Sequence, residues 1–348
     1  MDGKPMRVQL IRNAAETDDN QSGIGYYSNY IESLLRDSNT EYEVIHFETT
    51  RTNGIRSLLL DNMMFPLSRV LRTSKKADIV HATAEYCSVF FPFTRSKKVL
   101  TFHHVVKPGE THRTWDLIWH FSVFIARHFA DEFIAISDQT KDDMMKLLKI
   151  PDEKITVLTH PPKLSMHRID VEKEDIVLFL GTLCERKRPC LAIDAFRHML
   201  ENNELKGYRM VICGNGPMKP DVEGHIRRCG LEESVDIVHN LSEEEICGLY
   251  NRSKILLNTS SLEGLGITTL ESQKCGTPVL YFRDADIPKE IMVAAVPCED
   301  VRDMAGRALQ ILTDEEEMER IVKAGTDHAG SFGRDYFEEM MKVYSKHL

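Results

Sequence analysis

Short apolar runs that alternate with amphipathic stretches form the main pattern in the first half of the chain. The apolar runs have the length and the β-branched content typical of strands, and segments with helical periodicity lie between several of them. Strands are predicted at residues 7–11, 42–47, 78–81, 98–102 and 132–136, and helices at 26–35 and 114–130.

The same alternation begins again after Pro161 and Pro162, which interrupt any helix or central strand. Strands are predicted at residues 175–180, 208–213, 235–238, 255–258 and 277–282, and helices at 189–201, 219–229, 242–251 and 268–274. Continuous apolar strands that alternate with helices are typical of parallel sheets with both faces covered. The pattern therefore predicts an α/β protein of two doubly wound, Rossmann-like domains, residues 1–165 and 166–331, that face each other across a cleft.

Composition agrees with a folded protein of two domains. The chain has 348 residues, of which 42% are hydrophobic and 28% charged, and a chain of this length usually forms more than one core. The apolar run at 176–180 is far too short to span a bilayer, and the first residues lack the apolar segment of a secretory signal. A cytoplasmic location is therefore expected. The eight cysteines include no C-x-x-C pair, which favours free thiols over a disulfide framework or a zinc ribbon.

Charge is distributed unevenly along the chain. The net charge of −10 falls on the second half, which disfavours nucleic acid as a partner. Residues 51–76 are locally basic and contain several leucines and methionines, and residues 113–119 combine Arg113 with two tryptophans. This composition suits peripheral contact with the anionic inner face of a plasma membrane. A solvated basic helix that packs its leucines inward is the competing interpretation.

The most informative segment is 260–279. A strand ends near Asn258, a turn with two glycines follows, and a helix begins at 267–268, so the backbone N–H groups of Gly266, Ile267 and Thr268 could hold a phosphate. Glu263 lies before the turn and Glu271 within the helix, where they could accept hydrogen bonds from two sets of hydroxyls on one ligand. An ordinary strand–turn–helix with surface acids is the alternative.

This segment resembles the E-x7-E signature of the GT-B glycosyltransferases of the family-4 type (glycosyl transferases group 1). Residues 181–187 resemble the G-x-x-x-x-R-K loop of that family, residues 211–217 its following strand and G-x-G-P turn, and residues 231–245 the stretch before its donor-site helix. The resemblance extends over nearly the whole chain and is closest from 175 to 315. Four motifs in the family's order are far more specific than any one of them.

The resemblance implies a role for each matching residue. Glu263 would contact hydroxyls of the transferred sugar, Glu271 the ribose of the nucleotide, and Arg186 and Lys187 the departing diphosphate. Thr182 departs from the family pattern, which often has arginine there, and Arg186 would compensate. The remaining donor-binding residues implied are Gly23, Gly25, Gly214, Val238, Gly264, Leu265, Gly266, Ile267 and Thr268.

Two residues of the first half are further candidates. His103 follows the strand 98–102 on the edge where ligands of parallel sheets bind, and it matches a T-x-H motif of the family. We expect His103 to be an active-site residue that contacts the sugar or positions the acceptor, and His104 is the less favoured of the two. Ser137 is expected to cap the helix that follows it.

Two further motifs are explained without a metal ion or a dinucleotide. Asp284 and Asp286 resemble the D-x-D metal motif of the other, GT-A, fold, but a loop that caps a helix explains them better, so neither a metal nor another cofactor is expected. Gly214 and Gly216 lack the third glycine of a dinucleotide fingerprint, because position 219 is lysine.

The resemblance implies a retaining, metal-independent hexosyltransferase that moves a sugar from a UDP- or GDP-linked donor to a hydroxyl of a glycan. The basic segment favours a lipid-linked acceptor over a small soluble one. Residues 1–165 would bind the acceptor and 166–331 the donor, and a C-terminal helix within 332–348 would pack on the first domain. An epimerase or phosphorylase of the same fold, or a catalytically silent partner of another transferase, remain alternatives.

Overall fold

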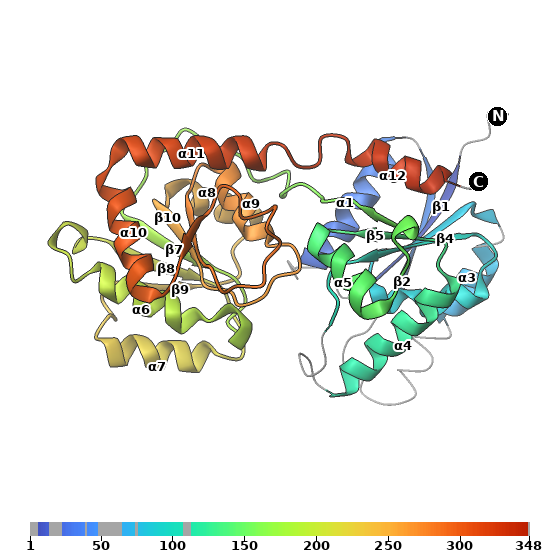
Figure 1. Ribbon diagram of the computed structural model, residues 1–348, viewed down its shortest axis with the longest axis horizontal. Helices are drawn as coiled ribbons and strands as arrows, with labels where there is room; N and C mark the ends of the chain where they lie inside the picture. Colours follow the sequence, from blue (N-terminus) through green and yellow to red (C-terminus); the bar gives the residue numbers. More distant parts are fainter. Residues whose placement is uncertain are drawn as a thin grey trace. The chain divides into compact units, whose positions relative to one another are not determined.

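The computed structural model describes residues 6–13, 23–38, 40–47, 65–73, 76–106 and 113–346. These residues form two compact units (Figure 1). The first contains the described residues up to His160 together with those from Asp335 onward, and the second extends from Pro161 to Arg334. The proline pair noted in the sequence thus begins the second unit.

The first unit is built on a parallel sheet of six strands in the order β2-β1-β3-β4-β5-β6. Its strands are β1 (Arg7–Asn13), β2 (Glu41–Phe47), β3 (Ile79–Ala82), β4 (Lys97–Phe102), β5 (Glu132–Ala135) and β6 (Ile155–Val157). Its helices are α1 (Gly23–Asp37), α3 (Phe65–Thr73), α4 (Arg113–Phe129), α5 (Asp138–Leu148) and α12 (Tyr336–Ser345), with 3-10 turns η4 (Glu85–Phe93) and η5 (Asp152–Lys154).

The C-terminal helix α12 completes the core of the first unit. Tyr336 and Tyr344 are buried beside α1 and β1 residues such as Tyr27 and Leu10. The hydroxyl of Tyr336 donates to Tyr27 at 2.9 Å, and the hydroxyl of Tyr344 lies 2.7 Å from Nδ1 of the buried His81. These hydrogen bonds satisfy polar atoms that would otherwise be costly to bury.

The second unit has a parallel sheet in the order β12-β11-β10-β7-β8-β9. Its strands are β7 (Ile176–Leu180), β8 (Arg209–Cys213), β9 (Val235–Val238), β10 (Ile255–Asn258), β11 (Val279–Phe282) and β12 (Val296–Cys298). Its helices are α6 (Pro189–Met199), α7 (Lys219–Cys229), α8 (Glu243–Arg252), α9 (Ile267–Lys274), α10 (Val301–Thr313) and α11 (Glu315–Ala329), with 3-10 turns η6 (Glu185–Lys187) and η7 (Asn203–Leu205).

The strand order of the second unit fixes where its ligand site is expected. From β7 the chain proceeds through β8 to β9 on one side and then returns to place β10 on the other side of β7. In open α/β sheets, ligands bind beyond the carboxyl ends of the strands at such a switch point. The loops after β7 and β10 therefore meet where a site should form, and the predicted class of two doubly wound α/β sheets is confirmed.

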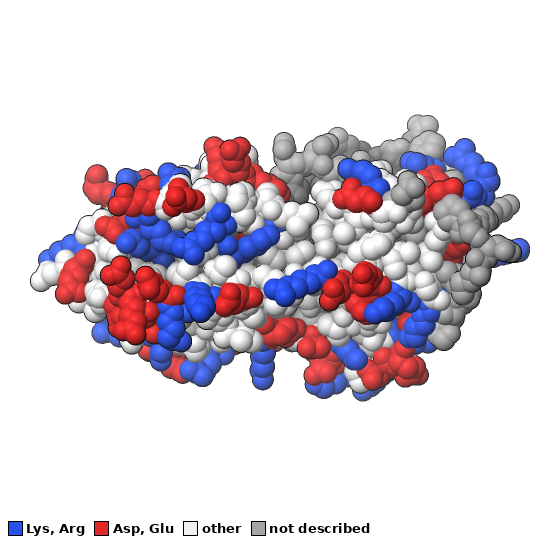
Figure 2. All heavy atoms as spheres, turned by 90° about the horizontal axis from the view of Figure 1, so that it is seen from above, with Lys and Arg blue, Asp and Glu red and all other residues white. Residues whose placement is uncertain are grey.

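Three further observations concern the surface charge, the cysteines and the hydrophobicity of the helices. On the face shown in Figure 2, basic side chains are interspersed with acidic ones. All eight cysteines lie among the described residues, and none of them forms a disulfide. In the described ranges, no helix combines the length and the apolar character needed to cross a membrane.

Candidate active site

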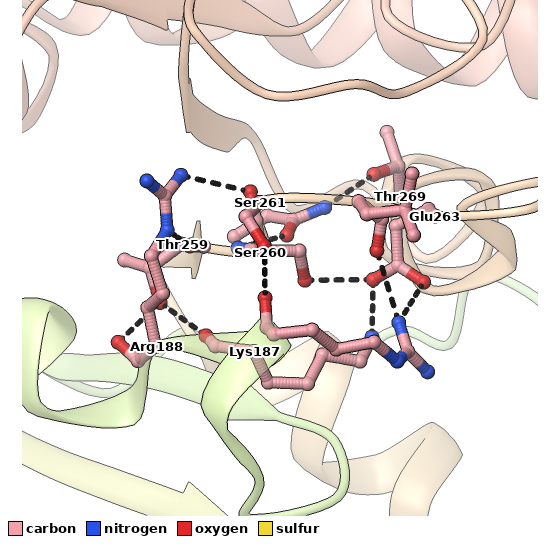
Figure 3. A network of polar contacts seen from close by, with 10 residues as sticks. Lys187, Arg188, Thr259, Ser260, Ser261, Glu263 and Thr269 are labelled. Atoms are coloured by element: carbon pink, nitrogen blue, oxygen red, sulfur yellow. Dashed lines mark hydrogen bonds and ion pairs between the residues drawn. The ribbon is translucent and has the colours of Figure 1, made fainter. Parts of the chain in front are cut away.

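The two loops at the switch point of the second sheet are joined by an ion pair. The ammonium of Lys187, which ends η6 after β7, pairs with Oε1 of Glu263 in the loop after β10 (Figure 3). Both residues are only 8% exposed. Buried charges of this kind persist when they are paired and hydrogen-bonded. The predicted residues Lys187 and Glu263 therefore lie in direct contact.

Both carboxylate oxygens of Glu263 are engaged. The hydroxyl of Ser260 donates to Oε1 at 2.7 Å, and Nη1 of Arg186 donates to Oε2 at 3.0 Å. Burial raises the pKa of Glu263, but the charges and hydrogen bonds of Lys187 and Arg186 outweigh it, so the pKa lies below its ordinary value. Glu263 is therefore a carboxylate at neutral pH, facing two cations from the other loop.

The loop after β7 also contacts the loop after β8 closely. The N–H of Gly181 donates to the carbonyl of Cys213 at 3.0 Å, and a Cβ on Gly214 would lie 1.9 Å from the carbonyl oxygen of Gly181. No side chain fits at position 214. This close backbone approach accounts for Gly214 without a ligand, and its assignment to donor binding stays a prediction.

Helix α9 begins within the glycine turn after Glu263. Gly266 precedes its first residue, Ile267, with φ +83°, a left-handed conformation that favours glycine, and a Cβ there would lie 3.3 Å from Ile287. The first N–H groups of a helix have no partner within the helix and carry its positive dipole end. The turn at Gly264 and Leu265 thus leads directly into the start of α9, and the use of its amides for a phosphate stays a prediction.

Glu271 lies on α9 and is buried. Its Oε2 accepts a hydrogen bond from the hydroxyl of Tyr250 at 3.1 Å, whereas Oε1 has no hydrogen-bond partner within the described part of the chain. Burial is the largest influence and raises the pKa of Glu271 from its ordinary 4.5 to about 7. A buried acceptor without a donor suits a ligand hydroxyl, because an unmade hydrogen bond is costly.

Arg188 is a third cation of this region, and its sequence position alone does not distinguish it from its two neighbours. Its guanidinium donates to the carbonyls of Thr259 at 2.6 Å and Ser260 at 3.0 Å (Figure 3), and to both carboxylate oxygens of Asp284 at 3.1 and 3.2 Å. Arg188 therefore connects the loops after β7, β10 and β11. The only signal in the sequence was the basic run Arg186-Lys187-Arg188. The fold shows that Arg188 contacts neighbouring loops, whereas the other two residues contact Glu263.

The expectation that Asp284 and Asp286 cap a helix is wrong. No helix begins between β11 and β12. Asp284 pairs with Arg188, and the backbone of Asp286 exchanges hydrogen bonds with the loop after β10, donating to Ser261 and accepting from Glu263 at 2.7 and 3.0 Å. The D-x-D segment thus fixes the backbone beside Glu263.

In the first unit, His103 follows β4 and is buried. Its Nε2 lies 2.8 Å from the carbonyl of Thr83, to which it donates, so Nδ1 is the acceptor of the neutral ring. Burial lowers the pKa of His103 to about 4. The backbone N–H groups of His103 and His104 both donate to the buried carboxylate of Glu85, at 2.7 and 3.2 Å.

Glu85, which begins η4, is not among the residues predicted from the sequence. An acidic residue in the apolar stretch after a strand was the one available signal. Gly23 is exposed at the first position of α1 and Gly25 is buried two residues later, so both lie in the first turn of the helix and not before it, and their assignment to donor binding stays a prediction. Ser137 accepts from the N–H of Thr140 at 3.0 Å, which confirms it as the N-cap of α5.

The structure thus brings Arg186, Lys187 and Glu263 into contact. Glu271 lies in the next helix, and Val238 ends β9, where its carbonyl accepts from Gly214 at 2.9 Å. His103, Gly23 and Gly25 belong to the other unit.

The family model described as "Glycosyl transferases group 1" matches residues 166–328, and that described as "Glycosyltransferase Family 4" matches residues 27–161. A relative from Campylobacter jejuni, GalNAc-alpha-(1->4)-GalNAc-alpha-(1->3)-diNAcBac-PP-undecaprenol alpha-1,4-N-acetyl-D-galactosaminyltransferase, is 26% identical over 66% of this chain and 64% of its own length. The chain spans about half to two thirds of the length of such relatives.

Solved structures agree on the architecture. The structure of Anabaena HepE in complex with UDP and glucose has a TM-score of 0.75 at 14% identity and covers 98% of this chain and 99% of its own. That of WaaG, a glycosyltransferase involved in lipopolysaccharide biosynthesis, has a TM-score of 0.74 at 14% identity over 97% of this chain and all of its own. The fold of this chain is therefore the GT-B fold, and the chain belongs to the family-4-type, group 1 glycosyltransferases.

Proposed function

We propose that the protein transfers a sugar from a nucleotide-sugar to a hydroxyl of a glycan acceptor, with retention of configuration at the anomeric carbon. The observation that carries the proposal is the contact of Lys187 and Arg186 with Glu263 at the switch point of the second sheet. Cations, helix-start amides and carboxylates together match the diphosphate and the hydroxyls of such a donor.

A UDP-linked sugar is the first donor to test, and a GDP-linked one the second. HepE was solved with UDP and with UDP-glucose, and it has the same fold. Glu271 offers a buried carboxylate oxygen without a hydrogen-bond partner in the described residues, which fits a ribose hydroxyl. Both donors contain that ribose, so the choice between them depends on the base.

In the proposed reaction, the bond from the anomeric carbon to the phosphate oxygen breaks, and a bond to the acceptor oxygen forms on the same face. The acceptor proton passes to the departing phosphate oxygen. Negative charge develops on the departing phosphate oxygen, and it is stabilised by Lys187, Arg186 and the amides at Gly264–Thr268. The nucleoside diphosphate can therefore leave without the help of a divalent ion. Glu263 orients the sugar hydroxyls, and neutral His103 accepts a hydrogen bond from the sugar or the acceptor.

A lipid-linked acceptor is supported by one face of α4. Leu117, Phe121 and Phe124 are 68%, 59% and 59% exposed, and their spacing places them on one side of the helix, ahead of Arg127 and His128 in its last turn. An apolar face beside basic side chains suits an anionic membrane surface. The Campylobacter jejuni relative is named for an undecaprenol-linked substrate.

The earlier candidate for membrane contact, 51–76, falls largely outside the described residues. Within it, Arg69 and Leu71 of α3 are exposed and Val70 is buried. Cosedimentation with anionic and zwitterionic vesicles tests the α4 face. We expect binding to the anionic vesicles alone and its loss in the double variant Phe121→Asp and Phe124→Asp. Equal sedimentation of the variant would contradict contact through the α4 face, and failure of the wild type to sediment with either vesicle would contradict membrane contact.

The transfer itself is tested by incubating the protein with UDP- and GDP-sugars and a panel of glycan acceptors, lipid-linked ones included. The expected result is release of the nucleotide in step with an extended glycan whose new linkage has the anomeric configuration of the donor. Conversion of the donor without an acceptor would instead identify an epimerase, and phosphate-dependent cleavage a phosphorylase. Failure to bind any nucleotide would favour a silent partner of another transferase.

A further inference from the structure

Helices α6 and α7 place cysteine, aspartate and histidine side chains, all of them metal-binding types, at their shared boundary. They lie side by side in the second unit (Figure 1), joined by a hydrogen bond between Asp194 and His225. Cys190 and Asp194 are four residues apart on α6, and His225 and Cys229 are four residues apart on α7. Residues at this spacing lie on the same face of a helix, so each helix contributes one cysteine and one other metal-binding type to the shared boundary.

The side chains of Asp194, His225 and Cys229 converge. A carboxylate oxygen, a ring nitrogen and the Sγ atom of these residues all lie within 4.8 Å of one another. Nε2 of His225 lies 2.9 Å from Oδ1 of Asp194, and Nη2 of Arg228 lies 3.3 Å from Nδ1. Because a guanidinium only donates, Nδ1 is the acceptor and the neutral ring carries its proton on Nε2, facing the carboxylate.

We propose that Asp194, His225 and Cys229 bind a divalent transition-metal ion, with zinc the best fit. A thiolate, an imidazole and a carboxylate on facing helices form a donor set typical of zinc and unsuited to magnesium or calcium, which require oxygen ligands alone. The ion would replace the Nε2 proton between His225 and Asp194. Tetrahedral zinc bonds of about 2.0 Å place two such ligand atoms about 3.3 Å apart, so a small movement from 2.9 Å suffices.

Cys190 is the candidate for the fourth ligand. It is half-buried in the first turn of α6, and its thiol is close enough to Asp194 and Cys229 for their charges to influence it. Two thiolates and one carboxylate would leave the zinc site with one negative charge, which Arg228 beside His225 would balance. This site is separate from the residues proposed for transfer and takes no part in that chemistry.

A metal here would have a structural consequence. The first turn of α6 directly follows Arg188, which is the residue before its first helical position. An ion that fixes Cys190 and Asp194 to α7 would hold the start of α6, and with it the loop that contains Arg186, Lys187 and Arg188. Its expected role is to stabilise the second unit in this region.

The test uses the full chain, reduced and stripped of metal, titrated with Co²⁺ as a spectroscopic probe and then with Zn²⁺ in competition. We expect one equivalent of Co²⁺ per chain with sulfur-to-cobalt charge-transfer absorption, displacement by Zn²⁺, and a higher melting temperature with zinc. His225→Ala and Cys229→Ser should each weaken binding at least a hundredfold, and Cys190→Ser should weaken it less.

The matched control is His198→Ala, which removes a histidine of α6 that lies outside the proposed site and whose Nδ1 pairs with the carboxylate of Glu201 at 2.9 Å. It should bind Co²⁺ as the wild type does. Absence of thiolate-ligated Co²⁺ in the reduced wild type, or equal binding by Cys229→Ser, would overturn the proposal. A Cys190–Cys229 disulfide that persists in the reduced preparation would also overturn it.

Discussion

The ammonium of Lys187 and the carboxylate of Glu263, 76 positions apart in the chain, form a buried ion pair beyond the carboxyl ends of the neighbouring strands β7 and β10. Arg186 and Ser260 complete the hydrogen bonding of that carboxylate. Both cations proposed for the diphosphate therefore pair with the residue proposed for the sugar. These contacts fix the three side chains relative to one another.

Replacing either partner should remove most of the transfer activity. We expect Lys187→Ala and Glu263→Gln to lower kcat about a hundredfold or more, the usual effect of removing a group that stabilises transition-state charge or orients the substrate. Lys187→Ala also leaves a buried carboxylate with less compensation, so its melting temperature should fall.

Steady-state rates with the identified donor check this, and Lys206→Ala, which removes an exposed lysine of the same unit, is the control. A Lys187→Ala enzyme that is folded and as active as the Lys206→Ala enzyme would refute the assignment of the site.

Arg188 should matter through the loops that it connects. Arg188→Lys cannot reproduce the fork that reaches two carbonyls and both oxygens of Asp284, so we expect a lower melting temperature and a higher KM for the donor. Asp284→Asn removes only the exposed end of this network and should have a smaller effect on both. Thermal melts and donor titrations of the two variants test this order, and the reverse order would contradict it.

Periodicity was enough to predict most elements of the second sheet. The strands β9 and β10 and the helix α7 have the bounds that the sequence predicted, because buried strands and amphipathic helices of a parallel sheet differ clearly in their apolar spacing. The capping box of Ser242 and Glu245 likewise begins α8 within one residue of the prediction.

The contacts within the site could not be predicted in the same way. That Lys187 reaches Glu263, or that Asp284 pairs with Arg188, depends on the order of strands β7, β10 and β11, which local spacing does not encode. Glu85 was missed for the same reason, since its function is to accept N–H groups of residues beyond the next strand.

Glu271 should make the stability of the protein depend on pH. Its folded-state pKa of about 7 lies above its ordinary 4.5, so between these values the folded chain retains a proton that the unfolded chain releases. The stabilisation is complete below about pH 4.5 and is lost as the pH rises through 7, by at most about 3 kcal/mol.

Denaturant unfolding at a series of pH values measures this effect. Glu271→Gln, which mimics the protonated group, should flatten the fall in the free energy of unfolding between pH 5 and 8. An equally steep fall in the variant would assign the effect to other groups.

His103 should act as a neutral hydrogen-bonding group. Burial lowers its pKa to about 4, so the ring does not titrate between pH 5 and 8. His103→Ala should lower kcat by tenfold or more, whereas His104→Ala, a change at a partly exposed neighbour, should stay within about twofold. A step near pH 6.5 in the kcat profile of the wild type that disappears in His103→Ala would contradict a neutral role.

The most direct test is calorimetric titration of UDP, and separately of GDP, into metal-stripped protein in the presence of EDTA. The account predicts binding of one nucleotide at a single site without a divalent ion, weakened at least tenfold by Lys187→Ala and unchanged by Lys206→Ala. Binding that requires added Mg²⁺, or equal affinity in the Lys187→Ala protein, would contradict it.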